Sequence, residues 1–119
     1  MAKKIFIVDD DRMLTKIVQS CLQEHGYEVS VSHDGEEALA KIGHERPDLL
    51  LLDVVMPKMN GYTFLFEMRK LEHGAAVPVI VLTCKEEMAD IFKVEGVKEY
   101  LIKPFPNQDL LEKIKKYVG

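Results

Sequence analysis

Residues that could do chemistry directly follow four short apolar runs of the sequence. In chain order they are Asp9-Asp10-Asp11, Asp53, Thr83 and Lys103-Pro104, after the runs Ile5–Val8, Leu49–Leu52, Val79–Leu82 and Tyr100–Ile102. If the runs are parallel strands of one sheet, the carboxylates, the hydroxyl and the ammonium group gather at the edge where α/β proteins bind ligands. Such a set suits a hard divalent cation with oxygen ligands, and Mg²⁺ would offset the repulsion among the carboxylates.

Each of these residues also has an ordinary structural explanation when it is taken alone. An aspartate before a helix is commonly an N-cap, which Asp10 or Asp11 can be, and Thr83 can cap a helix in the same way. Asp53 is harder to explain, because Pro57 and the pair Asn60-Gly61 favour turns rather than a helix after it. The ordinary explanations together require a coincidence at four strand ends, so we expect one charge-balanced site.

The hydrophobic pattern predicts elements that bring these residues together. Tyr27–Val31 is a fifth short apolar run, and the five runs alternate with longer segments in which apolar residues recur at helical spacing. The first predicted helix has the apolar positions Met13, Leu14, Ile17, Val18, Cys21 and Leu22, and Gly26 stops it. The second has the apolar positions Ala38, Leu39 and Ile42; Asp34 can cap it, and it ends near Gly43 and Pro47. The third helix follows the cap Asn60, and its inward apolar residues are Phe64, Leu65, Met68 and Leu71. The fourth spans about Glu86–Glu95, where Met88, Ile91 and Phe92 can face inward. The fifth has the apolar residues Leu110, Leu111, Ile114, Tyr117 and Val118. The pattern predicts an α/β fold, (βα)5, with a doubly wound five-stranded parallel sheet.

Length and composition limit the alternatives. The chain has 119 residues, 47% of them hydrophobic, which predicts a single globular domain over 1–119. Its 16 basic and 20 acidic residues give a net charge of −4, which argues against direct nucleic-acid contact. Its two cysteines form no disulfide framework or zinc motif, and no apolar run is long enough for a signal peptide or membrane span. We expect a cytoplasmic protein with no membrane association.

Four motifs, in their order along the chain, resemble the receiver domain of two-component response regulators. They are Val8-Asp9-Asp10, the segment Leu52–Gly61 with its Met56-Pro57, the pair Leu82-Thr83, and Tyr100-Leu101-Ile102-Lys103-Pro104-Phe105. The resemblance extends from Lys3 to about Val118. It implies a flavodoxin-like sheet with strand order 2-1-3-4-5.

The resemblance also implies the chemistry of the site. Asp53 is then the phosphoacceptor, which takes a phosphoryl group from a histidine kinase or phosphotransfer protein in a Mg²⁺-dependent reaction. Asp10, Asp53 and the backbone carbonyl of Val55 would bind Mg²⁺ directly, and Asp9 would act through metal-bound water. Asp11 matches no metal ligand of the family. The protein would be no enzyme, but a signalling switch that catalyses only its own phosphorylation and dephosphorylation.

A conformational switch is implied as well. Lys103 would balance the charge of the phosphoryl oxygens, and a cis peptide bond before Pro104 would aim it into the site. The Thr83 hydroxyl would bond one of these oxygens, and Tyr100 would move into the space that Thr83 vacates. The face made by the helix near 86–95, the strand before Lys103 and the last helix would then change for a downstream protein target or an output domain missing from this chain.

Some positions depart from the family pattern. Cys84 follows Thr83, where Ala, Gly or Ser is usual, and the segment between Thr83 and Tyr100 is about two residues short. Val55 and Lys85 occupy positions that tune attack by water on the acyl phosphate. Because Val55 cannot hydrogen-bond a water, we expect slow self-dephosphorylation.

Other functions remain open at this point. A receiver-like scaffold not controlled by phosphorylation is the main alternative. A phosphatase-like hydrolase usually has a second aspartate two residues after its nucleophile, where this chain has Val55, and a nucleotide-binding module would need a Gly-rich loop after the first strand. Whether the chain stands alone or belongs to a longer one is not settled, nor is the choice between a monomer and a weak dimer.

Overall fold

The element order alternates strands and helices through the described part of the chain. The computed structural model describes residues 2–53, 59, 61–71, 77–83 and 97–118. Its elements are β1 Lys4–Val8, α1 Arg12–Glu24, β2 Glu28–Ser32, α2 Gly35–Glu45, β3 Leu49–Asp53, α3 Gly61–Met68, β4 Val79–Thr83, β5 Val97–Ile102 and α4 Asn107–Val118. The helix expected near 86–95 lies outside the described residues, so α4 is the last helix of the sequence prediction. No helix in the described ranges is long and apolar enough to cross a bilayer.

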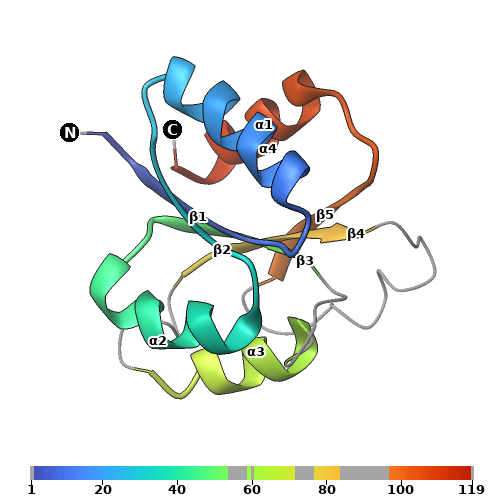
Figure 1. Ribbon diagram of the computed structural model, residues 1–119. Coiled ribbons are helices and arrows are strands. Elements are labelled where there is room, and N and C mark those ends of the chain that lie inside the picture. The colour runs from blue at the N-terminus through green and yellow to red at the C-terminus, as the bar shows by residue number, and fades with distance from the viewer. Residues whose placement is uncertain (1, 54–58, 60, 72–76, 84–96, 119) are drawn as a thin grey trace.

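All five strands form one parallel sheet in the order β2-β1-β3-β4-β5, which confirms the predicted fold class and strand order. Helices α1 and α4 cover one face, and α2 and α3 cover the other (Figure 1). Side chains alternate between the two faces along each strand, so Ile5 and Ile7 pack with α1 and α4, whereas Phe6 and Val8 pack with α2 and α3. The continuous apolar runs of β1, β3 and β4 are needed because both of their faces are buried.

Helix α1 begins and ends where the sequence predicts. Asp11 is its N-cap, and its side chain accepts a hydrogen bond from the backbone N–H of Leu14 at 3.0 Å. Gly26 follows the helix with φ +89°, a conformation that favours glycine. Not every apolar position of the helix is in the core, since Met13 is 74% exposed and Ile17 is 51% exposed.

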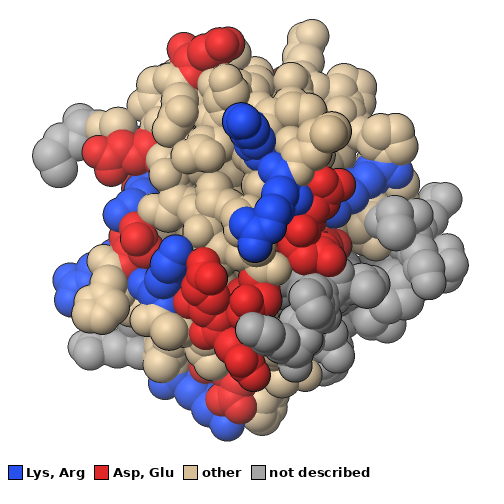
Figure 2. Space-filling view, viewed as in Figure 1, with Lys and Arg blue, Asp and Glu red and all other residues tan. Residues whose placement is uncertain are grey.

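Helix α2 is capped as expected and ends between the two residues predicted to end it. The Asp34 carboxylate accepts from the N–H of Glu37 at 2.8 Å. Acidic side chains gather over the start of the helix (Figure 2), where they complement the positive end of its dipole. The helix ends at Glu45, between Gly43 and Pro47 as predicted: Arg46 closes it in a left-handed conformation with φ 44°, and Pro47 prevents its continuation.

Two boundaries differ from the sequence prediction. Strand β5 begins at Val97, three residues before the apolar run, because pairing with β4 extends beyond the apolar residues. Leu71 lies beyond the end of α3 and is 36% exposed, so the expectation that it faces inward is wrong. The expected cap Asn60 lies outside the described residues, whereas Phe64 and Met68 are buried as predicted.

Gly43→Ala is expected to raise the free energy of unfolding by about 0.5–1 kcal/mol, because alanine loses less backbone freedom than glycine in a helix. A Cβ at this position would meet nothing within 4 Å. Gly26→Ala is the matched control, since a Cβ there also meets nothing within 4 Å but the backbone has φ +89°. We expect that variant to lose about 1 kcal/mol. Urea unfolding followed by circular dichroism measures both variants, and a shift of the same sign in both would contradict the argument.

Candidate functional site

The strand ends bring the polar residues of the sequence motifs to one edge of the sheet. The pairs nearest that edge are Val8 with Leu52, Asp53 with Leu82, and Thr83 with Ile102. The residues that follow β1 therefore lie beside the last residue of β3, and Lys103 follows β5 at the same edge. The register of the sheet, rather than any local motif, places these side chains together.

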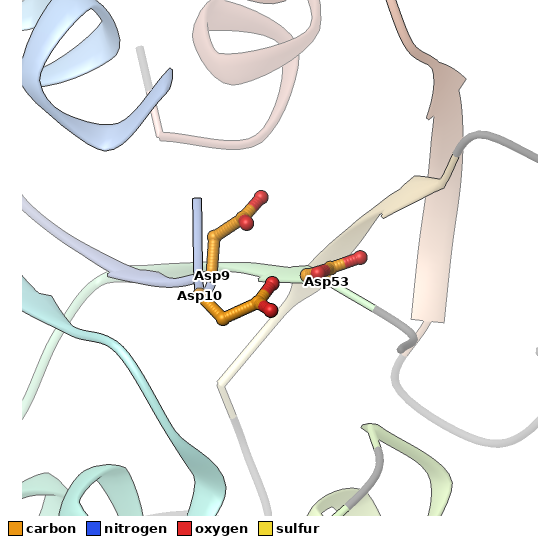
Figure 3. A group of neighbouring side chains, drawn as sticks. All are labelled: Asp9, Asp10 and Asp53. Carbon is orange, nitrogen blue, oxygen red and sulfur yellow. The ribbon is translucent and has the colours of Figure 1, made fainter. Parts of the chain in front are cut away.

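Three carboxylates form a cluster at this edge (Figure 3). Asp9, Asp10 and Asp53 each offer a carboxylate oxygen, and these atoms lie within 4.8 Å of one another. Asp9 and Asp53 are buried, whereas Asp10 is exposed. Oxygen donors of full negative charge are the ligands that Mg²⁺ and Ca²⁺ prefer, so the donor set fits a hard divalent cation.

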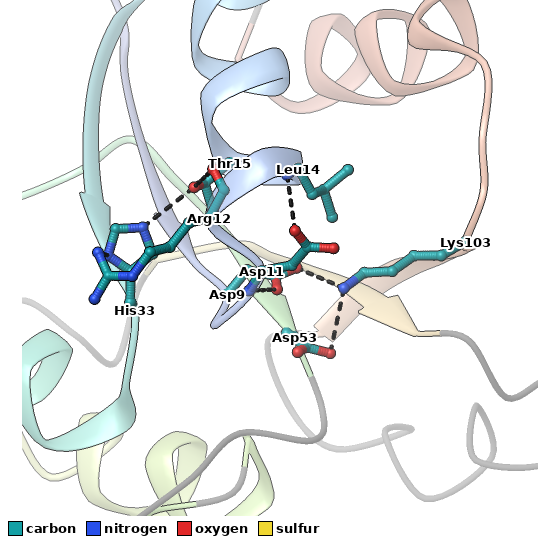
Figure 4. Close-up of polar contacts among 8 residues, drawn as sticks. All are labelled: Asp9, Asp11, Arg12, Leu14, Thr15, His33, Asp53 and Lys103. Atoms are coloured by element: carbon teal, nitrogen blue, oxygen red, sulfur yellow. Dashed lines mark hydrogen bonds and ion pairs between the residues drawn. The ribbon is translucent and has the colours of Figure 1, made fainter.

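Lys103 supplies the positive charge that these carboxylates need. Its Nζ lies 2.6 Å from Oδ2 of Asp9 and 3.7 Å from Oδ1 of Asp53 (Figure 4). Burial alone would lower the pKa of Lys103, but the hydrogen bond to Asp9 and the charges of Asp9, Asp53 and Asp11 outweigh it and raise that pKa. The lysine is therefore charged at neutral pH and sits between two strand ends.

The backbone holds Lys103 in this position. Its N–H donates to the carbonyl of Thr83 at 2.7 Å, which ties the residue after β5 to the end of β4. The peptide bond between Lys103 and Pro104 is cis, as the resemblance implied.

Asp9 uses both of its carboxylate oxygens within the protein. Oδ2 accepts from Lys103, and Oδ1 accepts from the backbone N–H of Asp11 at 2.9 Å. Asp11 itself turns its carboxylate to the start of α1, where it caps the helix (Figure 4). The three consecutive aspartates therefore have three different environments: Asp9 is paired and buried, Asp10 is exposed at the cluster, and Asp11 is a cap.

The two residues expected to form the switch lie on adjacent strands. Thr83 ends β4 and is 2% exposed. Tyr100 lies on β5 beside Val81 and is 44% exposed, so it is not a core aromatic residue. Val55, Cys84 and Lys85 lie outside the described residues.

His33 forms contacts at the start of α1 that the sequence did not predict. Arg12 Nη1 lies 3.2 Å from His33 Nδ1, and His33 Nε2 lies 3.2 Å from Thr15 Oγ1 (Figure 4). Because arginine can only donate, Nδ1 must accept, and Nε2 then carries the proton that it donates to Thr15. The Thr15 hydroxyl in turn donates to the carbonyl of Arg12 at 3.0 Å. This chain of bonds fixes the start of α1 to the residue after β2.

A second polar cluster, also missed, joins β5 to α4 next to Tyr100. The Glu99 carboxylate accepts from Lys113 Nζ at 2.5 Å and from the Tyr117 hydroxyl at 2.7 Å, and Lys116 Nζ lies 3.3 Å away. The bond from Lys113 is the main cause that lowers the pKa of Glu99 from 4.5 to about 2. The cluster holds the last helix on the edge strand.

A doubly wound parallel sheet of order β2-β1-β3-β4-β5, with three carboxylates and a lysine at its strand ends, defines a flavodoxin-like fold whose carboxylate cluster fits a cation. Residues 5–115 match the model of the response regulator receiver domain family, and the chain belongs to that family. It is a receiver domain of two-component response regulators, a class of signalling switch.

Individual relatives show the same relationship. The chain is 44% identical over 114 residues to the transcriptional regulatory protein CpxR of Klebsiella pneumoniae, an alignment that covers 94% of this chain and 47% of CpxR. The chain spans about half the length of the curated relatives it matches.

Solved structures agree in fold along almost the whole chain. The chemotaxis response regulator CheY4 of Vibrio cholerae superposes with a TM-score of 0.91 at 34% identity, covering 98% of this chain and 99% of that one. The response regulator TrrA of Thermotoga maritima, solved in complex with Mg²⁺–BeF, gives a TM-score of 0.86 at 34% identity, with 97% and 98% covered.

Glu99→Gln is expected to lower the free energy of unfolding at neutral pH, because the paired carboxylate is lost. Glu99 has a lowered pKa in the folded state, so its contribution is present above the unfolded pKa near 4.5 and is lost as the pH falls toward 2. We expect a loss of about 2 kcal/mol at neutral pH, less than the pKa difference alone would give because the group is partly exposed.

Urea unfolding at several pH values measures this difference between Glu99→Gln and the unchanged chain. The difference should shrink as the pH falls below about 4.5. Glu112→Gln is the control, because Glu112 is exposed on α4 and accepts only a long bond from Gln108 at 3.4 Å. A difference that does not change with pH would contradict the assignment.

Proposed function

We propose that this single domain, over residues 1–119, is the phosphoacceptor of a phosphorelay, with Asp53 as the residue that takes the phosphoryl group from a histidine kinase or phosphotransfer protein. One observation carries the proposal: the carboxylate of Asp53 lies in a cluster with Asp9 and Asp10, opposite the ammonium of Lys103. Family membership favours this function over the hydrolase and nucleotide-binding alternatives.

The same residues fit a bound Mg²⁺. Asp10, Asp53 and the backbone carbonyl of Val55 would hold the ion directly. Asp9 would act through water, which is supported by the engagement of both its oxygens with Lys103 and the N–H of Asp11. When bound, Mg²⁺ supplies charge neutralisation for the carboxylates and the phosphoryl oxygens.

Asp53, Lys103 and Thr83 would each have a separate role in the phosphoryl transfer. A carboxylate oxygen of Asp53 forms the new P–O bond while the P–N bond of the donor phosphohistidine breaks, and the donor imidazole leaves. Lys103 is fixed beside Asp53 and balances the charge on the phosphoryl oxygens, and the Thr83 hydroxyl donates to one of them. Because phosphoryl transfer depends mainly on positioning and charge stabilisation, a weak nucleophile is sufficient. The protein would catalyse only its own phosphorylation and dephosphorylation.

Phosphorylation would act on partners through Thr83 and Tyr100. The exposed Tyr100 would enter the space that Thr83 leaves as it moves toward the phosphoryl group, and the face that includes β5 and α4 would change. Driving such a pair of states from 1:99 to 99:1 takes about 5.5 kcal/mol, which new charge-assisted bonds at the site can approach. The partner on this face would be a downstream protein target or an output domain. The receiver would act in the cytoplasm as a monomer or weak dimer. It would contact neither a membrane nor nucleic acid directly.

Asp53→Asn is expected to abolish phosphorylation, because the amide cannot form the acyl phosphate. The protein is incubated with Mg²⁺ and acetyl phosphate, and its intact mass is measured for the gain of one phosphoryl group. Asp11→Asn is the matched control, because asparagine also caps helices. This variant should still gain the mass of one phosphoryl group. Absence of any gain in the unchanged chain would favour a scaffold not controlled by phosphorylation, and steady release of phosphate from unrelated esters would favour a hydrolase.

Val55→Asn is expected to shorten the lifetime of the acyl phosphate severalfold, because an amide can hydrogen-bond the attacking water and valine cannot. Decay is followed by intact mass after acetyl phosphate is removed. Val55→Ala is the control for access alone, since it makes room without adding a hydrogen-bonding group. An unchanged or longer lifetime in Val55→Asn would contradict the expectation of slow self-dephosphorylation.

A further inference from the structure

The turn between β1 and α1 is bonded to the end of β2 on both sides of Asp10. Before Asp10, the backbone N–H of Asp9 donates to the carbonyl of Ser32 at 3.1 Å. After Asp10, the side chain of Arg12 is bonded to His33, the residue that follows Ser32 (Figure 4). Two consecutive residues at the end of β2 therefore hold the chain on either side of Asp10.

His33 holds Arg12 through both its side chain and its backbone. The guanidinium donates to His33 Nδ1 at 3.2 Å, and His33 Nε2 lies 3.2 Å from the hydroxyl of Thr15. That hydroxyl donates to the backbone carbonyl of Arg12 at 3.0 Å. The bonds close into a ring that joins the first turn of α1 to the residue after β2.

Thr15 makes this ring rigid because it is buried. The residue is 2% exposed, and its backbone N–H donates to the carbonyl of Asp11 at 3.0 Å. A buried hydroxyl depends on partners within the protein, since water cannot replace them. His33 is the donor to this hydroxyl, and the carbonyl of Arg12 is its acceptor. Loss of the imidazole would therefore release the first turn of α1 from β2.

Asp10 is the member of the carboxylate cluster whose position depends most on this turn. Asp9 is buried and bonded to Lys103, and Asp53 is buried at the end of β3. Asp10 is exposed, so packing does not hold its carboxylate in place. The position of that carboxylate therefore follows the backbone that the end of β2 holds.

We propose that His33 is a positioning residue for Asp10: it ties the first turn of α1 to the end of β2 and so places the exposed carboxylate of the cluster. The inference rests on the proposed function, in which Asp10 binds Mg²⁺ directly. Mg²⁺ requires near-ideal octahedral geometry, so a small displacement of one ligand weakens its binding. His33 acts on the cluster through Arg12 and Thr15 and is itself neither a ligand nor a catalytic residue.

His33→Ala tests the inference against His25→Ala. His25 lies at the other end of α1, where its Nδ1 is 2.9 Å from the carbonyl of Cys21. The full chain is titrated with MgCl₂ at neutral pH, and amide ¹H–¹⁵N spectra measure the metal affinity and show that each variant is folded. We expect His33→Ala to weaken Mg²⁺ binding about threefold, less than the roughly tenfold effect of groups bonded directly to a metal ligand. His25→Ala should bind Mg²⁺ like the unchanged chain.

Thr15→Val tests the hold on the backbone alone, because it keeps the shape of Thr15 and the bond between Arg12 and His33 but removes the hydroxyl. It should also weaken Mg²⁺ binding. Combined with His33→Ala, it should weaken binding by less than the product of the two separate effects, because both substitutions break the same bond. Effects that multiply would overturn the route through Thr15. Lost charge does not explain weaker binding, since removal of a positive charge near the carboxylates would strengthen the binding of a cation.

A second readout does not depend on the metal. Without Mg²⁺, the backbone ¹³Cα shifts of Asp10 and Asp11, which report dihedral angles, should change in His33→Ala and stay the same in His25→Ala. His33→Gln should restore part of the Mg²⁺ affinity, because its amide N–H can donate to Thr15 from near the position of Nε2. If the contact only stabilised the fold, the folded variants would all bind Mg²⁺ like the unchanged chain.

The outcomes separate this inference from the proposed function. Unchanged Mg²⁺ affinity in His33→Ala, or equal weakening in His25→Ala, overturns the inference and leaves the metal site standing. Absence of Mg²⁺ binding in the unchanged chain overturns the proposed metal site itself, and the positioning of its ligand with it. Weaker binding in His33→Ala that His33→Gln partly restores, with His25→Ala unaffected, supports the inference.

Discussion

The ion pair between Lys103 and Asp9 is the interaction on which the site depends. Asp9 is fully buried, and a buried carboxylate without a partner costs several kcal/mol. The nearby carboxylates of Asp10 and Asp53 add repulsion that only a positive charge can offset. Lys103 supplies this charge at 2.6 Å from Asp9, and its own backbone is fixed by the carbonyl of Thr83. The cluster can therefore exist in the folded protein before any metal or phosphoryl group binds.

Much of the fold and the placement of these groups can be predicted from the sequence, because both follow from strong local signals. The apolar runs of β1, β3 and β4 identify strands buried on both faces, and parallel strands necessarily end at one edge. Asp11 and Asp34 cap helices as their positions predict. The roles of Asp53, Lys103 and Thr83 in phosphoryl transfer come from family resemblance and remain proposals, since geometry alone does not identify a phosphoacceptor.

The contacts that the sequence did not reveal join residues with no shared pattern. His33 meets Arg12 and Thr15 across 21 and 18 residues, and neither spacing corresponds to a helix or a strand. Glu99 and Lys113 meet because β5 and α4 pack together, which periodicity predicts without saying which polar side chains pair. The sequence places the end of α2 near Gly43 and Pro47 but does not reveal its capping residue, because glycine is usual at a left-handed cap and here Arg46 adopts that conformation.

The distance along the chain between Asp9 and Lys103 has a consequence for the newly made protein. The two residues are separated by 94 positions, and their strands are not neighbours in the sheet. At synthesis rates of about 5–20 residues per second, the acidic end of β1 is made roughly 5–20 s before its lysine. During that interval the growing chain has the carboxylates without their counter-charge, and the sheet lacks the edge strand that brings it. A nascent receiver therefore cannot assemble this site early, and its competence to accept a signal begins only when the last strand has joined.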